Sequence, residues 1–186
     1  MRLHPCALLM GLTVFATPVH AEVEKLLLHC EQQQKLCAFF RPAVTAPDGW
    51  VENKEATEYF KAVMLLPKDL SFEKSPVKIY AMAVYNRDKR PLAGFLPDAI
   101  ADWKSRAKDA KIATLPELAR GTGKAAFVRR SFDSAKLKEQ GHELQAVTTD
   151  SDKDGNEFII TITLSANSRE AVKSAEAAYM SILAKY

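Results

Sequence analysis

Short apolar runs bounded by turn residues predict several β-strands from residue 58 onward. The run from Glu58 to Leu66 is apolar, ends at Pro67 and has only a loose period. That pattern favours a largely buried strand, with a helix as the alternative. The other predicted strands are Lys78 to Tyr85, Lys111 to Leu118, Gly123 to Phe132, His142 to Thr149 and Glu157 to Leu164.

Two segments have apolar residues at three- and four-residue steps, which is the period of an amphipathic helix. The first extends from Leu92 to Ala107, and Pro97 is most easily accommodated in the first turn of its main helix. The second follows Asn167, which can cap it with Glu170 three residues later. Its apolar face consists of Val172, Ala175, Tyr179, Ile182, Leu183 and Tyr186.

These elements predict an α+β protein in which one antiparallel sheet packs against two amphipathic helices. The segment from Leu26 to Phe40 has a polar middle between apolar arms and predicts an additional N-terminal hairpin. No internal repeat or second linker interrupts the pattern, so residues 22–186 are expected to form a single domain.

The order of these elements resembles the Mog1/PsbP-like fold, which includes the periplasmic DcrB-like proteins. The resemblance covers residues 47–186 and is carried by short motifs: Pro47-Asp48-Gly49-Trp50, the strand end Leu66-Pro67, Trp103 in the middle helix, and the last strand continuing through Asn167 into a terminal helix. It implies a binding or assembly role and no shared catalytic residues. The N-terminal hairpin is a departure from that pattern.

The first 21 residues have the three regions of a cleavable signal peptide. Arg2 is followed by an apolar run from Ala7 to Ala16, and Val19 and Ala21 precede the expected cleavage before Glu22. An uncleaved membrane anchor is the alternative, but the run is about half of the roughly 20 residues that span a bilayer. The sequence therefore predicts a periplasmic or secreted protein.

Composition excludes some partners. The formal net charge is +3, and cations and anions are interspersed along the chain, so no nucleic-acid-binding face is indicated. No later stretch is apolar enough to predict a membrane span.

Cys30 and Cys37 are the two cysteines that remain after the predicted leader. In an oxidising compartment such a pair is interpreted as a disulfide, here joining the two strands of the hairpin. A redox-active pair is the alternative, but the spacing is wider than Cys-x-x-Cys and no helix start follows.

The segment Asp150-x-Asp152-x-Asp154-Gly155 is the most specific chemical motif, because alternate carboxylates in a tight loop can converge on one calcium ion. Asp150, Asp152, Asp154 and Asn156 are the candidate ligands. The loop has Thr161 where a complete EF-hand has glutamate, so a polar hairpin turn is the competing interpretation. No other cofactor is predicted.

Other motifs for catalysis are incomplete. Gly121-Thr122-Gly123-Lys124 lacks the remaining residues of a phosphate-binding loop, and no Gly-x-Ser-x-Gly elbow is present. His29 and His142 are the histidines beyond the leader, without a metal-ligand spacing. Arg87, Lys89 and Arg90 in one turn, with Arg129 and Arg130 on a strand, could meet an anionic partner, but a solvated turn is the favoured interpretation.

These observations favour an exported, non-catalytic domain that binds an envelope protein or a small ligand. The second hypothesis is a calcium-binding module or metal-dependent enzyme that uses the Asp150 to Asp154 loop. A hydrolase whose site is assembled from scattered residues is a third, because such sites are defined by geometry and not by order along the chain.

Overall fold

A computed structural model describes residues 23–30 and 35–186. The predicted signal peptide, residues 1–21, lies outside the described residues. The elements in chain order are β1 (Val23–Cys30), β2 (Lys35–Pro42), β3 (Trp50–Glu52), α1 (Lys54–Phe60), β4 (Val63–Pro67), β5 (Val77–Tyr85), α2 (Leu92–Arg106), β6 (Lys111–Leu118), β7 (Phe127–Asp133), β8 (His142–Ser151), β9 (Glu157–Ala166) and α3 (Arg169–Lys185).

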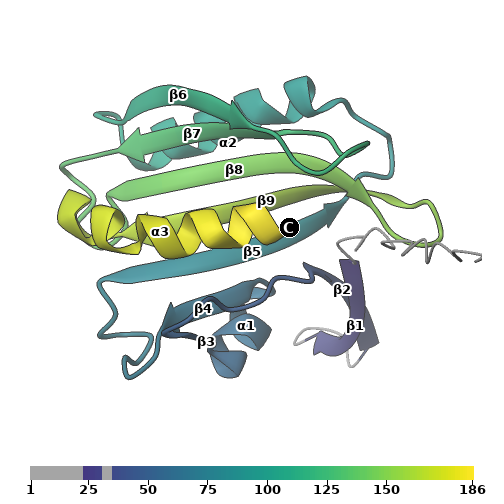
Figure 1. Ribbon diagram of the computed structural model, residues 1–186, viewed down its shortest axis with the longest axis horizontal. Helices are drawn as coiled ribbons and strands as arrows, with labels where there is room; N and C mark the ends of the chain where they lie inside the picture. Colours follow the sequence, from purple (N-terminus) through teal and green to yellow (C-terminus); the bar gives the residue numbers. More distant parts are fainter. Residues whose placement is uncertain (1–22, 31–34) are drawn as a thin grey trace, which may run out of the picture.

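Seven strands form one antiparallel sheet in the order β3-β4-β5-β9-β8-β7-β6, and β1 and β2 form a separate two-stranded sheet (Figure 1). The predicted α+β class is therefore confirmed. β9 is the central strand, and every residue from Phe158 to Ala166 is buried. Such continuous burial requires that both faces of the sheet be covered.

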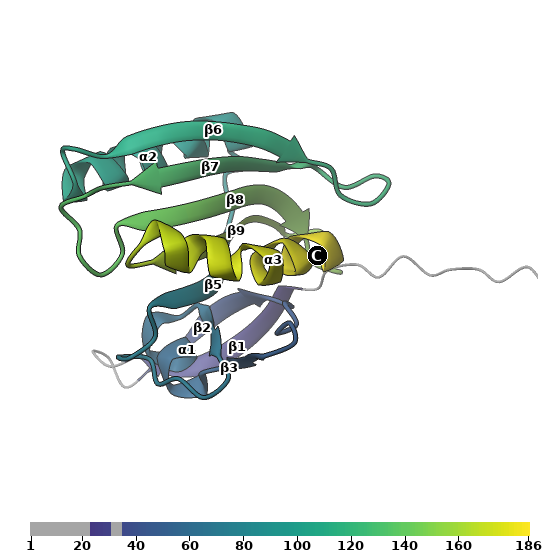
Figure 2. The same ribbon diagram turned by 60° about the vertical axis from the view of Figure 1, so that its left-hand side comes forward.

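The two predicted amphipathic helices cover opposite faces of the sheet (Figures 1 and 2). On one face, Tyr179 of α3 packs among the even-numbered residues of β9 and donates a hydrogen bond of 3.2 Å to the carbonyl of Ile162. On the other face, Leu96 of α2 packs against Val147 and Ile159. Near the end of α2, Trp103 stacks on Phe132 of β7 with ring centroids 5.2 Å apart.

The sequence predicts a strand from Glu58 to Leu66, and this prediction is wrong for the first part of the segment. Residues up to Phe60 belong to α1, and β4 begins at Val63. Asn53 caps α1 through its side chain, and Lys61 ends it in the left-handed conformation with φ 54°. The left-handed turn at Lys61 therefore separates a helix from a strand within one apolar run, and periodicity alone cannot locate such a boundary.

Two details of the helix ends also differ from the sequence prediction. Ser168, not Asn167, caps α3, because its hydroxyl accepts a hydrogen bond of 3.1 Å from the amide of Ala171. Asn167 instead donates its backbone N–H to the carbonyl of Pro76. Pro97 is the sixth residue of α2 and not part of its first turn, and Pro91 holds the N-cap position.

The predicted N-terminal hairpin is confirmed. β1 and β2 pair antiparallel from Val23 opposite Pro42 to Cys30 opposite Lys35. In this register Cys37 lies opposite Leu28, two positions from Cys30. The side chains of both cysteines lie outside the part of the structure that can be described, so the disulfide stays a prediction. Within the described residues, no helix has the length and hydropathy required to cross a membrane.

Candidate functional site

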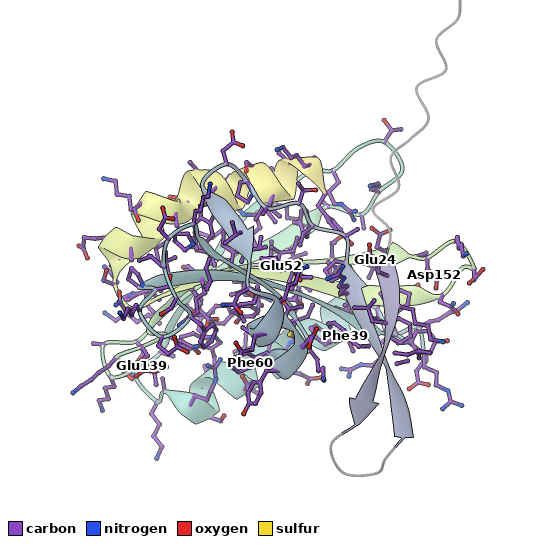
Figure 3. The ribbon with its side chains drawn as sticks, turned by 90° about the horizontal axis from the view of Figure 1, so that it is seen from below. Glu24, Phe39, Glu52, Phe60, Glu139 and Asp152 are labelled. Carbon is purple, nitrogen blue, oxygen red and sulfur yellow. The ribbon has the colours of Figure 1, made fainter. Side chains whose placement is uncertain are left out.

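A cavity of about 1330 Å³ lies between the N-terminal hairpin and one end of the seven-stranded sheet. We call it the hairpin cavity. Four parts of the chain line it: residues 23–26 of β1, the loop between β6 and β7, the end of β8 with the β8–β9 turn, and the aromatic residues Phe40, Tyr85 and Phe158. Figure 3 shows Glu24 of β1 and Asp152 of the turn on the same side of the molecule.

The apolar wall of the hairpin cavity is a cluster of three rings. Phe40 of β2 lies 5.0 Å from Phe158 of β9 and 6.1 Å from Tyr85 of β5, measured between ring centroids. Tyr85 and Phe158 are cross-strand neighbours, 5.6 Å apart. Phe158 is fully buried, whereas Tyr85 keeps 46% of its surface exposed. The wall therefore anchors the hairpin and still presents aromatic surface to the cavity.

Arg120 forms the base of the opposite wall, and its side chain is only 1% exposed. It pairs with Asp150 at 2.9 Å and donates to the backbone oxygens of Thr149 and Tyr186 at 3.3 and 3.2 Å. Its guanidinium also lies over the rings of Phe127 and Tyr186. These contacts join the β6–β7 loop, β8 and the end of α3 around one charge, which makes this wall rigid.

The four predicted calcium ligands do gather in one turn, but most of their oxygens already have partners. Asp150 is paired with Arg120. One oxygen of Asp152 accepts the amides of Asp154 and Asn156, both at 2.9 Å, and the other accepts the Asn156 side chain at 2.8 Å. These hydrogen bonds, chiefly from Asn156, hold the pKa of Asp152 below its usual range.

The bonds of Asp152 are those of a polar hairpin turn, closed by Gly155 at φ 76°. Among residues 23–30 and 35–186, no group of three or more histidine, cysteine, aspartate or glutamate side chains is arranged to hold a metal ion. Calcium binding stays a prediction.

Glu143 is a buried acid that the sequence did not single out. It is 3% exposed, and its carboxylate accepts hydrogen bonds from the Trp103 indole at 3.0 Å and from the Ser165 hydroxyl at 3.2 Å. Burial raises its pKa, partly offset by these hydrogen bonds. Strand alternation alone would put Glu143 in solvent, but α2 covers that face of β8. Glu143 is remote from the lining of the hairpin cavity.

The basic residues considered from the sequence do not form one patch. Arg90 pairs with Asp98 of α2 at 3.0 Å. Arg129 of β7 lies on the face of the sheet that α3 covers, where it contacts the sulfur of Met180. His142 contacts Asp133 at 2.7 Å, and Asp133 is also paired with Arg169.

Comparison with known proteins gives a limited result. No protein-family model matches this sequence, and no curated protein matches it. Among solved structures, the chain is similar to the solution structure of cyanobacterial PsbP from Synechocystis sp. PCC 6803. The two are 12% identical with a TM-score of 0.41, over 92% of this chain and 96% of that chain. That protein is of the PsbP type, the type that the order of elements resembles.

Proposed function

We propose that this protein is a non-catalytic binding domain of the bacterial cell envelope and that the hairpin cavity is its binding site. The observation that carries the proposal is the exposed ring of Tyr85, set in a cavity beside Phe40 and Phe158. A concave surface with an apolar wall and a few polar groups is the usual form of a ligand site.

Three charged groups of the hairpin cavity, Arg120, Asp150 and Asp152, have partners within the fold, which supports binding over catalysis. Arg120 and Asp150 neutralise each other, and Asp152 is engaged by the N–H groups of its own turn. Catalytic acids and bases, in contrast, have to exchange protons with a substrate. The envelope location is supported by the leader-like first 21 residues.

To test the proposal, the protein comprising residues 22–186 is recovered from an envelope extract. Native mass spectrometry then measures the molecules that it has retained. Tyr85→Ala removes exposed aromatic surface inside the cavity and should lower ligand retention several-fold. Tyr59→Ala is the matched control, because Tyr59 is 74% exposed on α1 and does not line the cavity. Equal retention by the two variants would contradict this assignment, and a measured turnover would contradict a non-catalytic role.

A second candidate function is calcium binding in the β8–β9 turn, which lines the same cavity. It is supported by the presence of Asp150, Asp152 and Asp154 within five consecutive positions. Calcium would have to displace the internal hydrogen bonds of Asp152. Calorimetry decides the matter: binding predicts heat and a higher melting temperature at millimolar calcium, both lost in Asp152→Asn. Absence of both effects removes this candidate.

A further inference from the structure

We propose that the outer edge of β1 accepts an extended peptide as an added strand inside the hairpin cavity. The inference rests on the proposed function and specifies its ligand: a polypeptide segment with apolar side chains at alternate positions. Strand addition uses the backbone of the domain for affinity and neighbouring pockets for selectivity.

The outer edge of β1 has no described strand beside it, which favours strand addition. β1 pairs with β2 along its whole length, and no other described strand lies beside it. Nor does any backbone group of residues 23–30 bond to a described turn or loop. In an antiparallel pair, alternate residues direct their N–H and C=O groups away from the partner strand. The outer edge of β1 therefore presents a row of donors and acceptors without described backbone partners.

The hairpin cavity borders this edge of β1. Val23, Glu24, Lys25 and Leu26 are consecutive, and all four line the cavity. Successive side chains of a strand point to opposite faces, so one face alone supplies only every second residue. Four residues in a row indicate that the cavity meets the strand edge-on, which is the direction from which an added strand approaches.

The aromatic wall of the hairpin cavity also favours an added strand. A strand added at β1 would place every second side chain on one face, about 7 Å apart. Phe40 of β2 and the half-exposed Tyr85 provide an apolar surface for those side chains. A two-stranded ribbon is marginally stable by itself, so a third strand would also stabilise the hairpin. The far end of the ribbon stands away from the sheet (Figure 3), and Leu27 on it is 60% exposed.

The outer edges of the seven-stranded sheet are less suited to strand addition. β3 has only three residues. β6 contains Pro116 and a shift in register between Leu115 and Leu118, both of which hinder pairing at an edge. β1 has eight residues in continuous register and no proline.

The test is selection from a phage-displayed library of random linear peptides of about ten residues, long enough for one strand. The target is residues 22–186. We expect enrichment of sequences with apolar residues at alternate positions. A synthetic copy of the best peptide should bind wild type and Tyr59→Ala equally, and Tyr85→Ala several-fold more weakly.

Backbone methylation of the peptide distinguishes strand addition from other binding. Two peptides are compared, N-methylated on the odd or on the even amides. One set faces β1 and the other faces away, so one peptide should lose about tenfold or more in affinity while the other changes little. Amide hydrogen exchange at residues 23–26 should slow on binding.

Three results would overturn the inference: no enrichment over selection on Tyr85→Ala, equal effects of the two methylation patterns, or protection at β6 in place of β1. If native mass spectrometry finds a small molecule in the cavity while no peptide is enriched, the proposed function stands and strand addition is rejected. If peptides bind as predicted but the envelope extract yields no ligand, strand addition stands and the natural partner lies outside that extract.

Discussion

At the scale of single residues, Arg120 and Glu143 are both buried ionisable side chains, but only Arg120 has an oppositely charged hydrogen-bond partner. Arg120 is buried with a carboxylate, two backbone oxygens and two aromatic rings around it. Glu143 is buried among neutral hydrogen-bond donors, Trp103 and Ser165. The contacts of Arg120 therefore balance its charge within the fold, whereas burial favours the protonated form of Glu143.

Arg120→Ala is predicted to destabilise the protein by about 3–5 kcal/mol, because it leaves Asp150 without its buried partner. Urea unfolding of the variant measures this. Arg169→Ala is the control: Arg169 is exposed at the start of α3 and pairs with Asp133 at 3.4 Å, so its loss should cost under about 1 kcal/mol. A double-mutant cycle with Asp150→Ala should show strong coupling, and additive losses would contradict the pairing.

Glu143→Gln is predicted to change the pH dependence of stability. Because the pKa of Glu143 is raised on folding, the folded protein holds this proton to higher pH than the unfolded chain does. Its stabilising contribution is therefore complete at low pH and lost as pH rises through the folded pKa. Glutamine removes this titration, so the free energy of unfolding of the variant relative to wild type should rise as pH increases from the ordinary range of a glutamate through the raised pKa of Glu143.

Thermal unfolding at several pH values tests the Glu143 prediction, with the exposed residue changed in Glu139→Gln as control. A difference between Glu143→Gln and wild type that is constant with pH would show that Glu143 does not titrate in this range.

At the scale of elements, the N-terminal hairpin combines a confirmed prediction with an untested one. Its strands, register and packing through Phe40 are observed. Its predicted disulfide, Cys30 to Cys37, decides how firmly the far end of the ribbon is held. The hairpin cavity is lined by the other end of β1, residues 23–26.

The disulfide is tested by mass spectrometry of protein exported to an oxidising compartment. We expect a mass lower by two hydrogens than that of the reduced chain, and no alkylation of Cys30 or Cys37 before reduction. Reduction, or Cys30→Ser with Cys37→Ser, should destabilise the protein by roughly 2 kcal/mol, the low end expected for a short loop. Alkylation of both thiols in the exported protein would reject the disulfide.

The elements predicted from periodicity are largely confirmed where one type of periodicity extends over a whole element. β6 has the predicted bounds, and α2 and α3 cover the sheet with the stripes read from the sequence. The errors lie where conformation changes inside an apolar run or at a cap. Lys61 reverses the chain between α1 and β4, and Ser168 takes the cap position beside Asn167. Those choices depend on a few dihedral angles and hydrogen bonds that periodicity does not record.

At the scale of the whole molecule, export is the prediction on which the envelope proposal depends. Expression of the full chain in a Gram-negative host should yield a periplasmic protein whose N-terminal residue is Glu22, as determined by peptide mass mapping. Ala21→Arg should block cleavage and leave the longer precursor, because the peptidase requires a small side chain there. A cytoplasmic protein that retains residues 1–21 would contradict the prediction.

The site illustrates what sequence reasoning could reach. The sequence predicts a polar turn or a calcium loop at Asp150 to Asp154; the segment forms a polar turn that lines the hairpin cavity, and its ligand role stays a prediction. Arg120, Phe40 and Tyr85 were not selected, because they are far apart in the chain and none belongs to a motif. Only the register of β5 against β9 and the packing of β2 bring Tyr85, Phe158 and Phe40 together.

The sequence by itself determined the α+β class, most strands, both amphipathic helices and the hairpin, because each depends on local periodicity and turn residues. The tertiary structure alone decided that α2 and α3 lie on opposite faces, that Glu143 is buried, and that the hairpin borders a cavity at one end of the sheet. These properties arise from contacts between residues distant in the chain, and no local pattern contains them.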